Sequence, residues 1–153
     1  MTSLVFMMGD FSAQFPCDRL YVSNHMWALP LSNGRYRFGL TAYAVRLLQD
    51  VYFLDWTVES GSPVTSRQPI GSIESKKAES DLFAPASGTL EMFCEDCLKD
   101  PTAINLSTYD QGWLFDMIAV DASLMTPEEY VQHLESAWQV AQRTIKGQVN
   151  SED

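Results

Sequence analysis

The sequence predicts a mainly β domain, a sandwich or a barrel, with one short internal helix and one long C-terminal helix. Between about residues 33 and 120, short apolar runs alternate with turn signals at regular spacing, as is typical of antiparallel β proteins. After residue 126 the apolar residues switch to helical spacing. The chain has 153 residues, which is enough for one domain with a real hydrophobic core.

The strands are predicted from apolar runs that lie between turn residues. The Asn33-Gly34 pair indicates a hairpin, and Tyr36, Phe38 and Leu40 alternate after it. Turn residues at 60–63 and 85–88 separate later runs. The remaining predicted strands are 51–56, 69–75, 81–84, 89–93 and 112–120.

Two segments have helical periodicity. Residues 41–48 form a short predicted helix with Ala44, Leu47 and Leu48 on one face. The second helix begins with Thr126 as the N-cap and Pro127 at the first helical position, and Glu129 completes a capping box. Its apolar stripe is more typical of core packing than of a partner-binding face. The stripe consists of Tyr130, Val131, Leu134, Trp138, Ala141 and Ile145.

These predicted elements divide the chain into four parts. We expect an N-terminal extension over residues 1–20, a β domain over 21–125, a helix over 126–147 packed on that domain, and a flexible tail over 148–153. The predicted helix ends at Gly147, directly after Lys146, because glycine and a cation are both typical of helix C-termini. The apolar start, residues 1–8, lacks the positive charge of a secretory signal.

Composition excludes several classes of function. Ten basic and 20 acidic residues give a formal net charge of −10, which repels nucleic-acid phosphates and anionic lipids. No apolar run approaches the ~20 residues of a membrane helix, so neither nucleic acid nor a membrane is an expected partner. An odd, small number of cysteines, Cys17, Cys94 and Cys97, fits a reducing cytoplasm.

The sequence offers no recognisable catalytic or metal-binding motif. His25 and His133 are isolated in sequence, and His133 is interpreted as a helix-surface residue. Cys94 and Cys97 form a C-x-x-C pair without a second pair or a nearby histidine, so a complete zinc set is missing. A redox or metal role for this pair is the less favoured interpretation. We therefore expect no catalytic residues and no metal site.

The most informative segment is 74–88, where two predicted strands flank a polar stretch with lysines at its centre. A tight turn there would hold a lysine amine away from the sheet, within reach of a modifying enzyme. From composition alone, a solvated turn that happens to contain Lys76 and Lys77 is the more common explanation.

The residues of this segment resemble the lipoyl-attachment motif of the glycine cleavage system H protein family. That motif reads Glu-Ser-Val-Lys-Ala, then Ser-Asp-Leu-Tyr-Ala-Pro and a glycine. The departures are Lys76, Glu79 and Phe83. The resemblance runs from about residue 21 to residue 138. The other positions that match the family pattern are Tyr21, His25, Trp27, residues 39–44 and 51–54, Pro101, Ile104, Asn105, Tyr109 and residues 112–114.

The resemblance implies that Lys77 carries lipoic acid, because the family's modified lysine lies eight residues before the proline that matches Pro85. Biotin carriers have methionine on both sides of the lysine, and this chain does not. Recognition by lipoylating enzymes would involve the flanking positions, which are Glu74, Ser75, Lys76, Ala78 and Asp81. The implied fold is a lipoyl/biotinyl-domain-like flattened β-barrel, or barrel-sandwich hybrid, of two antiparallel sheets with Lys77 at a hairpin tip.

The implied function is that of a carrier protein and not of an enzyme. A lipoyl arm on Lys77 would shuttle an aminomethyl group between glycine decarboxylase (P protein) and aminomethyltransferase (T protein). Dihydrolipoamide dehydrogenase (L protein) would reoxidise the arm. The bound dithiolane would supply chemistry that protein side chains lack, and tethering would keep it at high effective concentration near each partner.

Two alternatives remain open. An H-like lipoate carrier could instead serve lipoyl relay or sulfur oxidation, since Lys76 and the 106–111 loop depart from the family pattern. An unmodified interaction domain that has lost its prosthetic group is the second alternative. Lys76 itself could steer an acidic partner, although a solvated substitution without a role is favoured.

Overall fold

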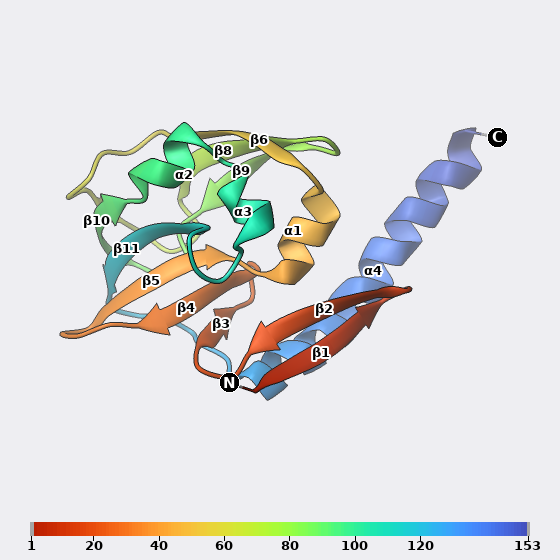
Figure 1. The fold of residues 1–153 in the computed structure, drawn as a ribbon, viewed down its shortest axis with the longest axis horizontal. Coiled ribbons are helices and arrows are strands. Elements are labelled where there is room, and N and C mark those ends of the chain that lie inside the picture. Colours follow the sequence, from red (N-terminus) through yellow and green to blue (C-terminus); the bar gives the residue numbers. More distant parts are fainter. Residues whose placement is uncertain (1, 153) are drawn as a thin grey trace.

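The computed structural model describes the backbone of residues 2–152 and the side chains of residues 2–143. Two larger antiparallel sheets enclose the main core (Figure 1). The first sheet has the order β3 (Leu20–Val22), β4 (Met26–Pro30), β5 (Arg35–Leu40), β11 (Trp113–Ala119), β10 (Gly88–Phe93) and β7 (Pro63–Val64). The second has the order β6 (Val51–Trp56), β8 (Pro69–Ser75) and β9 (Glu79–Phe83).

The main core lies between these two sheets and confirms the mainly β fold. Phe38, Leu90 and Phe115 of the six-stranded sheet are fully buried, as are Ile70 and Ile73 of the three-stranded sheet. Along β8, buried residues alternate with half-buried ones from Gly71 to Ser75, as expected for a sheet with one face on the core. Among the described residues, no strand pairing closes the two sheets into a continuous barrel.

A third sheet, which the sequence did not predict, lies at the N-terminus. Strand β1 (Ser3–Met8) pairs with β2 (Phe11–Pro16) through a two-residue turn, and Gly9 supplies the positive φ of 64° that this turn requires. The hairpin packs against helix α4 (Pro127–Glu152) around a second core. In that core, Phe15 lies edge-on to Tyr21 and Tyr130, and the rings of Tyr21 and Tyr130 stack with centroids 4.9 Å apart.

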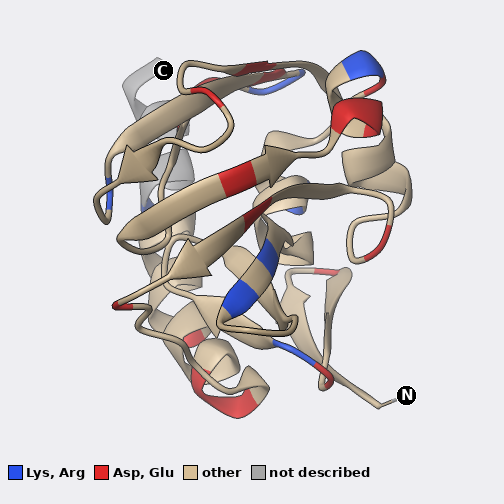
Figure 2. Ribbon diagram, turned by 90° about the vertical axis from the view of Figure 1, so that its left-hand side faces the viewer, with Lys and Arg blue, Asp and Glu red and all other residues tan. Residues whose placement is uncertain are grey.

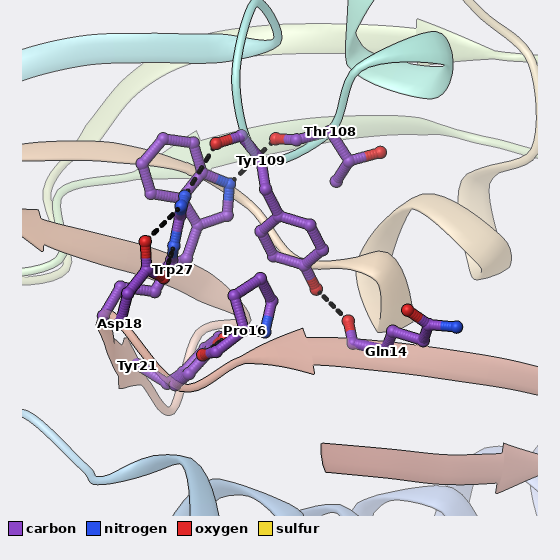
Figure 3. A network of polar contacts seen from close by, with 8 residues as sticks. Gln14, Pro16, Asp18, Tyr21, Trp27, Thr108 and Tyr109 are labelled. Carbon is purple, nitrogen blue, oxygen red and sulfur yellow. Dashed lines mark hydrogen bonds and ion pairs between the residues drawn. The ribbon is translucent and has the colours of Figure 1, made fainter. Parts of the chain in front are cut away.

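Polar contacts join this hairpin to a distant loop of the main domain (Figure 3). The Tyr109 hydroxyl donates a hydrogen bond to the carbonyl of Gln14 at 2.6 Å, and the Trp27 indole donates to the carbonyl of Thr108 at 3.0 Å. The Tyr21 hydroxyl donates to the Pro16 carbonyl at 2.7 Å, so the end of β2 is also tied down. The N-terminal extension is therefore a packed part of the molecule.

Helix α4 begins as the sequence predicted but extends further. Thr126 N donates to a Glu129 carboxylate at 2.9 Å, and Glu129 N donates to the Thr126 hydroxyl at 3.2 Å, which completes the capping box. Tyr130 and Leu134 are fully buried, as expected for a core-facing stripe. The predicted end at Gly147 is wrong, because α4 runs to Glu152. Glycine in a helix interior costs only about 1 kcal/mol, and no proline follows it.

Residue 153 and the side chain of Ile145 lie outside the described residues. The predicted tail of 148–153 is therefore helical up to residue 152.

Three short helices connect the strands. Helix α1 (Ala42–Leu48) is confirmed, with Thr41 as its N-cap, but its buried residues are Tyr43 and Val45, and Leu47 is exposed. Helices α2 (Glu95–Lys99) and α3 (Ala103–Leu106) follow β10 and were not predicted. No helix in the described part of the chain has the length and apolar character needed to span a bilayer.

Candidate functional site: the bend between β8 and β9

The two lysines occupy the bend that joins β8 to β9. These strands pair up to Glu74 opposite Glu79, and Ser75 N then donates a hydrogen bond to the Ala78 carbonyl at 2.9 Å. This bond leaves Lys76 and Lys77 as the two central residues of the bend. Both are exposed, and no ion pair involves either lysine among the described residues. The structure thus presents the Lys77 amine to solvent.

The Ser75 hydroxyl holds the backbone of the bend. Ser75 is buried, and its hydroxyl donates to the Ala78 carbonyl at 3.1 Å. The same oxygen accepts hydrogen bonds from Lys77 N at 3.3 Å and from Ala78 N at 3.2 Å. Serine is suited to this role because its short hydroxyl reaches backbone groups two and three residues further on. The side chain thereby orders a bend whose own side chains are in solvent.

A second set of contacts ties the bend to the connection between α1 and β6. Lys76 N donates to the Asp50 carbonyl at 2.8 Å. The side-chain amide of Asn105 holds both ends of this connection, because it accepts a hydrogen bond from Val51 N and donates one to the Gln49 carbonyl. Gln49 has a positive φ of 62°, which is uncommon for a residue other than glycine. Sequence reasoning did not identify these supports, because backbone contacts leave little trace in a sequence.

The other predicted flanking residues lie on the two strands next to the bend. Glu74 faces Glu79 across the hairpin, and Asp81 is exposed on β9 opposite Ser72. Glu74, Lys76, Ala78 and Asp81 therefore surround Lys77 on one hairpin, as the sequence predicted. They are available to an approaching enzyme because Lys76, Ala78 and Asp81 are exposed and Glu74 is half-buried.

An apolar pocket of about 310 Å³ begins at this hairpin. Ala78 of the bend and Ser80 of β9 line it on one side, and Ala44 and Leu48 of α1 line it as well. Leu47, which the sequence placed on one face with Ala44 and Leu48, lines the pocket together with them. The pocket is large enough for a short aliphatic chain, and its position next to the bend makes it accessible from Lys77.

The two histidines, isolated in sequence, lie together at the far side of this pocket. His25 lines the pocket, and its ring lies 5.9 Å from that of His133 between centroids. His25 Nδ1 is 2.9 Å from the Tyr130 hydroxyl, which is itself 2.9 Å from the Thr41 hydroxyl. Burial, and to a lesser degree His133, lowers the pKa of His25 to about 4. The description of His133 as a plain surface residue is wrong, because it is half-buried against His25 and Tyr130.

The described residues contain no group of three or more His, Cys, Asp or Glu side chains positioned for a metal ion. Cys94 and Cys97 are buried and lie far along the chain from the bend. A β domain that presents a solvent-exposed lysine on a tight hairpin bend has the architecture of a prosthetic-group carrier domain. Neither the bend nor the pocket contains an obvious nucleophile–base pair.

Comparison with known proteins supports this class. The family model "Glycine cleavage H-protein" matches residues 19–137. The chain is 35% identical over 120 residues to a glycine cleavage system H protein from Chlorobium phaeobacteroides. The match covers 76% of this chain and 94% of that protein. It is 36% identical over 124 residues to the protein of that name from Rubrobacter xylanophilus, covering 80% and 97%.

A solved structure is also similar. The glycine cleavage system H protein from Mycobacterium marinum matches with a TM-score of 0.71 and 32% identity, and the match covers 79% of this chain and 99% of that one. This chain belongs to the glycine cleavage H-protein family. Family and fold support the lipoyl-carrying role in the glycine cleavage system. The β1–β2 hairpin lies before the family match.

Proposed function

We propose that this protein is a lipoyl carrier of the glycine cleavage system, with lipoic acid in amide linkage to Lys77. The observation that carries the proposal is the position of Lys77, exposed at the centre of the β8–β9 bend while Ser75 holds the backbone beneath it. A lysine in this position offers a long stem and a free amine for acylation. When bound, the lipoyl group supplies the disulfide chemistry that accepts and releases the aminomethyl group.

The residues around Lys77 fit such a group. The amine is in solvent, so it is accessible to lipoylating enzymes, and no neighbouring carboxylate pairs with it among the described residues. The adjacent pocket is apolar and matches the aliphatic part of the group. Glu74 and Asp81 carry negative charge on either strand of the hairpin, where an enzyme that modifies the lysine would read them.

The chain's own residues position the arm and do not perform chemistry. Ser75 and the Lys76–Asp50 contact keep the bend rigid, so the arm swings from a fixed point. Tethering then keeps the group at high local concentration at each partner's active site. In this scheme the protein is not an enzyme but the shared substrate of glycine decarboxylase, aminomethyltransferase and dihydrolipoamide dehydrogenase. Its three free cysteines fit the reducing cytoplasm.

A reconstituted decarboxylation assay tests this function. The lipoylated protein is mixed with glycine decarboxylase and glycine, and exchange of labelled bicarbonate into the glycine carboxyl group is followed. We expect exchange that saturates with the lipoylated protein and is lost in Lys77→Arg. Lys76→Arg keeps both the lysine at 77 and the charge at 76, and serves as the matched control.

The assay also separates the alternatives. A lipoylated protein that supports no exchange, but donates its lipoyl group to another acceptor, would be an H-like carrier of lipoyl relay. A protein that remains unmodified in the presence of a lipoate ligase would be an interaction domain without a prosthetic group. Either result contradicts the proposal.

A further inference from the structure

The C-x-x-C pair, Cys94 and Cys97, is not used by the carrier function. Cys94 is the N-cap residue of α2 and Cys97 lies one turn further on, so the two side chains are neighbours. The Cys94 side chain is hydrogen-bonded to the Cys97 thiol. The Cys97 thiol also donates to the Gln111 carbonyl at 3.3 Å. The fold therefore brings together two thiols at the spacing found in redox-active dithiols.

The two cysteines have different surroundings. Both cysteines are buried, but Cys94, at 3% exposed, lines an open pocket of about 500 Å³ together with Lys99, Gln111 and Trp113, and Cys97 does not. A small molecule that enters this pocket meets Cys94 first. Cys97 is fully buried and does not line this pocket, so the mixed disulfide is expected to form on Cys94. This arrangement divides the pair into an accessible thiol and a resolving thiol.

Charged groups around the pair reinforce this difference. Arg37, which is ion-paired with Asp116, interacts electrostatically with Cys94, and the pocket lined by Cys94 contains Lys99 as well as Asp96 and Asp100. Burial, together with the nearby Cys94, Asp96 and Asp100, raises the pKa of Cys97 to about 12. On this side of the molecule β5 carries basic residues, β10 and β11 carry acidic ones, and α2 carries both (Figure 2).

We propose that Cys94 and Cys97 form a reversible intrachain disulfide by exchange with low-molecular-weight disulfides that enter the pocket lined by Cys94. Cys94, as thiolate, attacks one sulfur of the external disulfide, which breaks that bond and releases one thiolate that takes up the proton of Cys94. Cys97 then gives up its proton and attacks Cys94 Sγ, and the second external thiol leaves. One external disulfide is reduced to two thiols, and the two cysteines are oxidised.

The folded structure accommodates this product. The change breaks two weak hydrogen bonds, the one between the two thiols and the one from the Cys97 thiol to the Gln111 carbonyl, because both sulfurs lose their protons. The backbone on either side is already fixed, since Cys94 N donates to the Leu114 carbonyl at 2.9 Å and Leu98 N to the Cys94 carbonyl at 3.2 Å. The two cysteines are three residues apart at the start of a helical turn, a spacing at which side-chain rotation brings the two sulfurs toward each other.

Thiol mapping on the full-length, folded protein tests the proposal. The protein is incubated with oxidised glutathione, quenched in acid, alkylated in denaturant and digested. We expect the peptide that contains Cys94 and Cys97 to lose two hydrogen atoms, to carry no alkyl group, and to regain both thiols with dithiothreitol. Cys17 is the internal control, because it has no neighbouring cysteine within the described residues. The Lys77 peptide is scored separately, so oxidation of a lipoyl arm is not mistaken for this disulfide.

A trapping variant makes the order of events visible. In Cys97→Ser, Cys94 is expected to retain one glutathionyl group, because the resolving thiol is missing. The proposal is overturned if both cysteines of the wild-type protein are alkylated after the incubation while Cys17 has reacted. It is equally overturned if the disulfide forms only in protein that has first been unfolded in urea.

Discussion

At Ser75, one buried hydroxyl group organises the backbone of the bend that carries Lys77. It makes three hydrogen bonds, one as a donor and two as an acceptor, and all of them go to backbone atoms of residues 77 and 78. The hydroxyl therefore sets the direction in which the Lys77 side chain leaves the hairpin. A modifying enzyme that binds this bend finds it already ordered, and does not have to supply the ordering free energy itself.

This role predicts slower modification of Ser75→Ala. Without the hydroxyl, the enzyme must order the bend at a cost of about 1 kcal/mol, which corresponds to a rate of lipoylation about fivefold lower. The measurement is the initial rate of lipoate transfer to Lys77 by a lipoate ligase, followed by intact mass. Ser80→Ala is the matched control, because Ser80 is exposed on the same hairpin. Equal rates for the two variants would show that the hydroxyl has no such role.

His25 predicts a specific dependence of stability on pH. Its pKa is lowered to about 4 in the folded protein, chiefly by burial, against about 6.5 in the unfolded chain. The unfolded state therefore binds the proton first as the pH falls below about 6.5. The free energy of unfolding contributed by this group is complete above that pH and is lost toward pH 4. Between about pH 7 and pH 5 the loss is about 2 kcal/mol.

Urea unfolding at several pH values measures this dependence. In His25→Asn, which tolerates the positive φ of 69° at this position, that part of the pH slope should disappear. His133→Asn should keep most of it, because burial and not His133 is the main cause of the shift. A wild-type slope that is unchanged in His25→Asn would refute the assignment.

Among the elements, helix α4 depends on its first turn. The capping box joins Thr126 and Glu129 through two reciprocal hydrogen bonds, and the helix then delivers Tyr130 and Leu134 to the second core. Thr126→Ala should lower the free energy of unfolding by about 1 kcal/mol, since it leaves one backbone N–H of the first turn without its partner. Thermal or urea unfolding measures the change. Ser136→Ala, on the exposed side of the same helix, should change stability by less than about 0.5 kcal/mol, and an equal loss in both variants would contradict the capping role.

The elements also show which parts of the fold a sequence can predict. Local chemistry predicted the β4–β5 turn, where Asn33 and Gly34 both have positive φ, and it predicted β8 with the bounds that the structure shows. It missed β1 and β2, although the Gly9-Asp10 pair between them is a turn signature of a two-residue hairpin. It also placed the end of α4 too early at Gly147, where a single glycine costs less than the rest of the helix contributes.

For the molecule as a whole, the sequence predicted where the site residues lie but not the long-range contacts that support them. Lys77 and its flanking residues were placed on one hairpin from the motif alone, and the structure brings them together there. The contact between Lys76 and Asp50, the pocket beside Ala78 and the pairing of His25 with His133 were not predicted. All three join residues that are distant in sequence through backbone or ring contacts, and such contacts have no fixed spacing along the chain.

The β1–β2 hairpin is an addition to the family fold that packs against it. Strands β1 and β2 lie before the part that matches the family, yet they share a core with α4 and bond to the loop of Tyr109. That loop includes the positions where this chain departs from the family's sequence pattern. The hairpin and the altered loop therefore form one structural unit, at a distance in sequence of 95 residues between Gln14 and Tyr109.

The central claim, that Lys77 is the acylated residue, is tested most directly by mass. The full-length protein and its Lys77→Arg and Lys76→Arg variants are produced with lipoate and a lipoate ligase, and the intact mass and the modified peptide of each are measured. We predict that the wild-type protein and Lys76→Arg gain the mass of one lipoyl group on Lys77, and that Lys77→Arg gains none. A lipoyl group on Lys76, or an unmodified wild-type protein, would contradict the account.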